Sequence, residues 1–77
     1  MEVGDLLKLA AEARQAGNNA EARRLLDQAL TEAPDHPGVL NSLGLLALGE
    51  KDAARAIGLF ERAATLEVLF ADVLGTG

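Results

Sequence analysis

The side chains that could carry acid–base or metal chemistry are few, and they gather around one turn. His36 is the only histidine, and it stands between Asp35 and Pro37. A metal site needs three or four converging ligands, and a Ser-His-Asp arrangement using Ser42 and Asp35 needs a buried, oriented imidazole. Neighbours within one short turn meet neither condition, so we interpret His36 as a solvated turn or helix-cap residue. We expect no catalytic or metal-binding residue and no cofactor.

Two other patterns could also suggest chemistry. Glu32 with Asp35, and Glu50 with Asp52, are carboxylate pairs, but they flank predicted turns and suit solvated caps and helix-dipole partners. The glycines of residues 75–77 lack both the preceding strand and the following helix of a phosphate-binding loop, so we expect a frayed end there. Together these interpretations predict that the chain is not an enzyme.

Composition limits the fold and the partners. The 77 residues allow one small domain, and the absence of cysteine excludes disulfides and thiolate metal sites. Alanine and leucine dominate the 49% hydrophobic fraction, whereas Trp and Tyr are absent, which favours an all-α fold. The net charge of −5 argues against nucleic acid as a partner. No apolar run is long enough to span a membrane, and we expect a soluble, cytoplasmic chain.

Four helices are predicted from apolar residues that recur at spacings of three and four. Gly17 should close the first helix, over residues 3–16, and Asn18 should cap the second, with Glu21 reaching back to it. Pro34 should end the second helix and Pro37 should begin the third. A fourth is expected to begin after a cap at Asp52. The inward faces are predicted to include Leu6, Leu9, Ala10 and Ala13; Ala22, Leu25, Leu26, Ala29, Leu30 and Ala33; and Leu40, Leu43, Gly44 and Ala47. The fourth helix carries Ala53, Ala56, Ile57, Leu59, Phe60, Ala63 and Ala64 at the same helical spacing.

The helices repeat with a period of 34 residues, which is typical of stacked helix-turn-helix units. The shift aligns Leu6 with Leu40 and Ala10 with Gly44 in the first helix of each unit. The chain thereby resembles the tetratricopeptide repeat family, whose motif its packing residues match. The matching residues are Leu6, Leu9, Ala10, Ala13, Ala22, Leu26, Ala29 and Pro34, then Leu40, Leu43, Gly44, Ala47, Ala56, Phe60, Ala63 and, in place of proline, Val68.

The resemblance implies an all-α pair of antiparallel helix-turn-helix repeats that binds a protein, peptide or helix. Residues 1–34 would form the first repeat and residues 35–68 the second. In the family the first helix of each repeat lines a concave groove, so the predicted partner-binding residues are Leu7, Lys8, Ala11, Arg14, Gln15, Asn41, Ser42, Leu45 and Leu48. Leu45 and Leu48 are either an apolar floor or packing residues. The chain lacks matches to the family's two-carboxylate clamp, so we do not assign that activity.

The C-terminal tail, residues 69–77, is unusually apolar. Without a terminating proline, the fourth helix is expected to run on to Gly75 as a helical extension. Because residues 66–70 resemble the start of a protease site used in expression vectors, the tail could also be a cloning remnant. The tail could cap its own chain or pack against a second copy, and we expect a homo-oligomer. The predicted self-association face is Ile57, Phe60, Leu69, Phe70 and Leu74.

Two other roles remain open at the sequence level. The repeats could be an accessory segment of a larger multidomain enzyme, such as a hydroxylase or glycosyltransferase. They could also build a scaffold or filament by stacking their ends.

Overall fold

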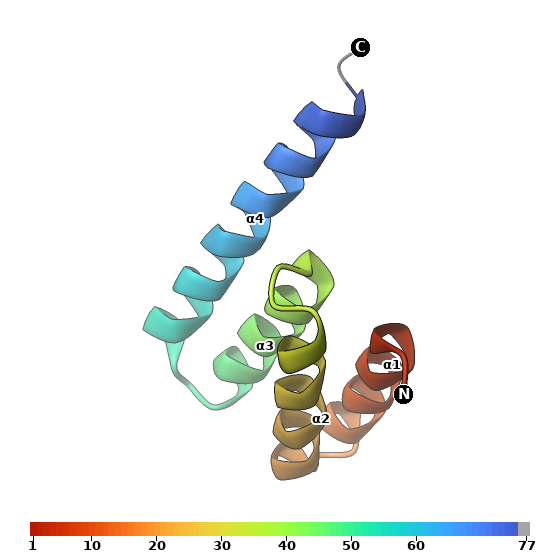
Figure 1. Ribbon diagram of the computed structural model, residues 1–77. Helices are drawn as coiled ribbons and strands as arrows, with labels where there is room; N and C mark the ends of the chain where they lie inside the picture. The colour runs from red at the N-terminus through yellow and green to blue at the C-terminus, as the bar shows by residue number, and fades with distance from the viewer. Residues whose placement is uncertain (76–77) are drawn as a thin grey trace.

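The computed structural model describes the backbone of residues 1–75 and the side chains of residues 1–71. Its four helices are α1 (Val3–Gln15), α2 (Asn19–Glu32), α3 (Pro37–Gly49) and α4 (Ala53–Gly75), and residues 1–75 contain no strand. Each helix packs beside the next, and α1 also contacts α3 (Figure 1). The all-α pair of helix-turn-helix repeats is therefore confirmed.

The turn between α1 and α2 forms largely as predicted. Gly17 has φ +80°, the left-handed conformation that glycine adopts without a steric penalty. The Asn18 side chain caps α2 by accepting a hydrogen bond from the Glu21 N–H at 3.3 Å. Glu21, however, does not reach back to Asn18, because the Asn18 N–H donates to the carbonyl of Ala13. The Glu21 carboxylate instead accepts two hydrogen bonds from Arg24, and this contact lowers the pKa of Glu21.

The turn between α2 and α3 is set by two prolines. The last helical residue of α2 is Glu32, just before Pro34, and Pro37 occupies the first turn of α3. His36 caps α3, since its Nδ1 accepts a hydrogen bond from the Gly38 N–H at 3.0 Å. The helix-cap interpretation of His36 is thus confirmed.

Between α3 and α4, Lys51 occupies the position where glycine closes α1. Its φ of +64° places a residue with a Cβ in the left-handed region. Asp52 then caps α4 as predicted, accepting a hydrogen bond from the Arg55 N–H at 3.2 Å. Glu50, beside this turn, forms an ion pair with Arg23 of α2.

Lys51→Gly should therefore stabilise the fold. Removing the left-handed strain is expected to raise the free energy of unfolding by about 1 kcal/mol. The matched change Gly17→Ala, at φ +80°, should lower it by about the same amount. Urea denaturation followed by circular dichroism measures both. Equal stability of Lys51→Gly and the parent chain would show that the lysine is unstrained.

The core lies between the helices and is wholly apolar among residues 1–71, with no buried polar or charged residue. The inward faces predicted for α2 and α3 contain most of it. The buried residues are Leu6, Ala10, Ala22, Leu25, Leu26, Ala29, Val39, Leu40, Leu43, Leu46, Ala47, Ala56 and Ala63, with Gly44 also buried in α3.

The prediction that Leu9 faces inward is wrong. Its side chain is 39% exposed, although its repeat equivalent Leu43 is only 3% exposed. Leu43 lies in the core cluster with residues of α1 and α2, because a helix pair precedes α3, whereas no helix of residues 1–75 covers the same side of α1. Position in the array, and not the helical period, decides the burial of this leucine.

The apolar residues of the first turns of α4 are likewise only partly buried. Ala56 and Ala63 are buried, and Leu59 and Phe60 are half-buried. Ile57 is 57% exposed, and Ala53 and Ala64 are exposed as well. The reason is the same as for Leu9: α4 has a helical neighbour in α3 and no helix after it among residues 1–75.

The predicted close crossing of the second repeat lies between Gly44 and Phe60. A Cβ added to Gly44 would lie 2.5 Å from Phe60 Cε1, which is far inside van der Waals contact. An alanine at this position would therefore force the ring of Phe60 to move. The equivalent pair in the first repeat is Ala10 with Leu26, both in the core cluster.

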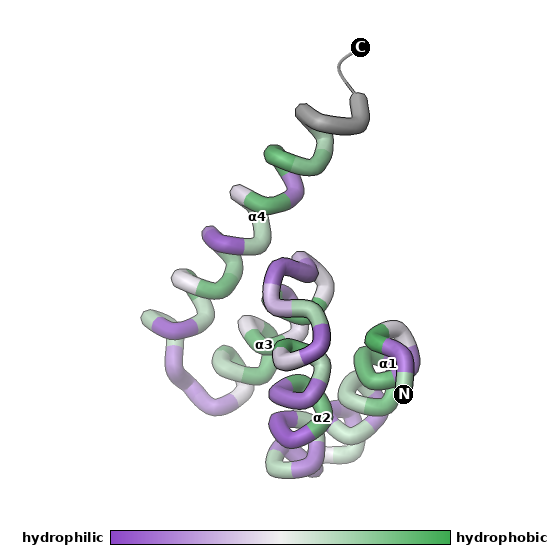
Figure 2. Tube along the Cα trace, viewed as in Figure 1, coloured by the Kyte–Doolittle hydropathy of each residue, from purple (hydrophilic) through white to green (hydrophobic). Residues whose placement is uncertain are grey.

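The fourth helix runs on as predicted, for 23 residues to Gly75. Its later turns extend beyond the other helices and carry several hydrophobic residues (Figure 2). Arg62 ties α4 to the turn between α2 and α3, since its Nη2 lies 3.4 Å from Asp35 Oδ1 and 3.5 Å from the Pro34 carbonyl oxygen. None of the helices described is both long enough and apolar enough to cross a membrane.

Candidate functional site

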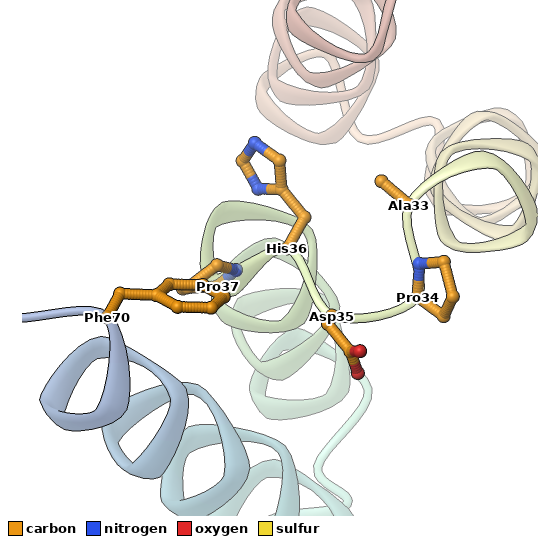
Figure 3. Close-up of a pocket in the computed structure, with 6 residues that line it drawn as sticks. All are labelled: Ala33, Pro34, Asp35, His36, Pro37 and Phe70. Atoms are coloured by element: carbon orange, nitrogen blue, oxygen red, sulfur yellow. The ribbon is translucent and has the colours of Figure 1, made fainter. Parts of the chain in front are cut away.

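The polar residues singled out by type do not assemble a reactive site. His36 and Asp35 border an open hollow of about 530 Å³ together with Ala33, Pro34, Pro37 and Phe70 (Figure 3). The His36 Nδ1 lone pair already accepts the Gly38 N–H, and Asp35 faces Arg62. Among the residues whose side chains are described, no group of three or more His, Asp or Glu residues could hold a metal ion.

The first helices of the two repeats lie beside each other, as a shared groove requires. Leu7 of α1 lies close to the start of α3: a Cβ added to Gly38 would be 3.4 Å from the Leu7 Cδ1. Within the predicted groove, Leu45 and Leu48 are 43% and 49% exposed, so neither is withdrawn into the packing between helices. Lys8 and Gln15 are exposed. The half-buried members are Leu7, Ala11, Arg14, Asn41 and Ser42.

The charges of the predicted groove residues differ from those of the chain as a whole. Only two of the nine predicted groove residues are charged, and both are basic: Lys8 and Arg14. The acidic residues of α1, Asp5 and Glu12, are exposed and lie at other helical positions, beside Leu9. The predicted groove residues therefore combine exposed leucine with positive charge on a chain whose net charge is −5.

The predicted self-association face divides between two sides of α4. Phe60 is half-buried against Gly44, and Phe70 borders the hollow beside Pro37 (Figure 3). Ile57 and Leu69 are 57% and 52% exposed. The predicted member Leu74 lies outside the described side chains.

The open side of α4 is formed by a set of residues that the sequence analysis missed in part. Ile57, Glu61, Ala64 and Val68 follow one another at spacings of four, three and four, so they share one face. We call these four residues the open stripe. Val68 is 67% exposed, and it borders a shallow hollow of about 290 Å³ with Ala64, Thr65 and Leu69. The helical spacing of these four residues is the sequence signal that identifies them as one face.

Comparison with known protein families identifies the family to which this architecture belongs. A family described as tetratricopeptide repeat matches residues 7–67, which is most of the chain. The chain belongs to the tetratricopeptide repeat family. Tetratricopeptide repeats are generally protein–protein interaction modules, and the family is typically a non-catalytic scaffold. No solved structure matches the chain.

Proposed function

We propose that this tetratricopeptide repeat chain binds a segment of a partner protein in the groove between α1 and α3. The observation that supports this function best is the exposure of two leucines of α3, Leu45 and Leu48, which the repeat register assigns to the groove. When a partner covers an exposed leucine, the complex is stabilised by about 25 cal/mol per Å² of apolar surface buried. A groove with an apolar floor gives affinity without requiring a catalytic group.

Polar residues of the groove would orient the partner. The Asn41 side chain can both donate and accept hydrogen bonds, which suits the backbone of an extended peptide. Lys8 and Arg14 would favour a segment that carries acidic residues beside its apolar ones, since opposite charges steer association. The partner class is therefore an acidic, partly apolar peptide or helix. Four other expectations stay predictions: that the chain has no catalytic activity, that it binds no cofactor, that it binds no nucleic acid, and that it is cytoplasmic.

Selection from a display library of short random peptides tests the groove. Peptides rich in leucine and acidic residues should be recovered, and Leu45→Ser should weaken their binding at least about tenfold, as expected for one lost leucine contact. Leu9→Ser is the matched control, because Leu9 has a similar exposure, 39% against 43%, but lies outside the groove. Equal loss of binding in both variants, or retention in both, would contradict the proposal.

A further inference from the structure

The open stripe of α4 is an apolar surface with acidic residues built into it. Glu61 lies within the stripe, between Ile57 and Ala64, and Glu67 lies next to it on the adjoining helix turn. All of these side chains are exposed. No other helix covers them, because the only helix that α4 contacts among residues 1–75 is α3. An occupant of the stripe should therefore supply both apolar surface and positive charge.

The same stripe on a second copy does not meet this requirement. If two α4 helices paired in parallel, Glu61 would face its own counterpart. If they paired antiparallel about Ala64, Glu61 would face Glu67, six residues along the helix. Like charges brought together at a partly desolvated contact are unfavourable.

End-to-end stacking of repeats meets the same obstacle. The side of α1 that a preceding repeat would cover carries Asp5, Leu9 and Glu12, whereas the equivalent positions of α3 are the buried Val39, Leu43 and Leu46. A stripe docked there would bring Glu61 toward two more carboxylates. Two acids thus stand on this side of α1 where α3 has buried apolar residues, which makes it unfavourable for a stripe that carries Glu61.

The groove of a second copy has the complementary character. It offers the exposed Leu45 and Leu48, and its two charged residues are Lys8 and Arg14. The stripe cannot enter its own groove, because α4 is a continuous helix on the far side of α3 from α1 (Figure 1).

We propose that the open stripe of α4 in one copy docks into the groove of a second copy, with Glu61 and Glu67 facing Lys8 and Arg14. This inference rests on the proposed groove function and names an occupant for the groove. Two reciprocal contacts of this kind would close a dimer. Raising the salt concentration should weaken the association, because the exposed charges that guide it are screened.

Charge exchange between variants tests this pairing in the full chain. Sedimentation equilibrium over a range of concentrations should show self-association of the parent chain. Glu61→Lys with Glu67→Lys should weaken it at least about tenfold, and so should Lys8→Glu with Arg14→Glu. An equimolar mixture of the two double variants should associate again, because each groove then meets a stripe of opposite charge. Circular dichroism confirms that each variant is folded.

Three outcomes would overturn the inference. The parent chain could stay monomeric at all concentrations, the mixture could fail to associate, or the groove variant could associate as tightly as the parent chain. The last result would favour contact through α4 alone. If the chain is monomeric but random peptides still bind in a manner that depends on Leu45, the groove function stands and only the self-docking fails. A chain carrying all four reversals supplies a second check, since its groove and stripe are again complementary and it should self-associate.

Discussion

Leu43→Ala should lower the free energy of unfolding by about 2–5 kcal/mol, the range for leucine truncation in a packed core. Leu43 is 3% exposed and belongs to the cluster that joins α3 to α1 and α2. A chain of 77 residues has a total stability of about 4–12 kcal/mol, so this change removes a large part of it. Urea denaturation at low protein concentration measures the loss without a contribution from association.

Leu9→Ala provides the comparison, because Leu9 occupies the same position of the first repeat. Its side chain is 39% exposed, and the change should alter stability by no more than about 0.5 kcal/mol. The two variants remove the same atoms from equivalent helix positions, so their difference measures what the preceding helix pair contributes. A loss at Leu9 as large as that at Leu43 would show that something covers this side of α1 in solution.

These two leucines also show how far sequence can predict this fold. Helical spacing, caps and prolines act over a few residues, and they predicted the turns at Gly17, Pro37 and Asp52. Burial depends on whether another helix lies on the same side, and a periodic pattern does not contain that information. Leu9 and Ile57 therefore have the residue type of a core position but not its surroundings.

The candidate surfaces illustrate the same limit. The repeat register predicts a set of groove residues, and the partner-binding role of that set stays a prediction. The structure places α1 beside α3 with Leu45 and Leu48 exposed. The side of α4 that stays open was predicted less well, because the predicted self-association face includes Phe60, which is half-buried. Phe60 rests on Gly44, and only the absence of a Cβ at that glycine makes room for it. Which aromatic faces inward depends on this single contact between helices.

Gly44→Ala should lower the free energy of unfolding by about 1–2 kcal/mol. The new methyl group would lie 2.5 Å from Phe60 Cε1, so the ring must move, and overpacking of this kind costs about 1–3 kcal/mol. The better helix propensity of alanine offsets up to about 1 kcal/mol of that cost. Gly58→Ala isolates the propensity term, since no atom lies within 4 Å of its added Cβ, and it should stabilise α4 by about 1 kcal/mol.

Combining Gly44→Ala with Phe60→Leu should recover much of the loss. The double variant has alanine and leucine at the crossing of the second repeat. The first repeat has the same two residue types at the equivalent positions, Ala10 and Leu26, and both pack in one core cluster. Phe60→Leu alone should destabilise, because it leaves space above a glycine. A double-mutant cycle should therefore give a coupling energy of about 1 kcal/mol or more. Additive effects, or a gain for Gly44→Ala equal to that of Gly58→Ala, would mean that the ring swings aside freely. Gly44 would then not be needed for the close packing of α3 and α4.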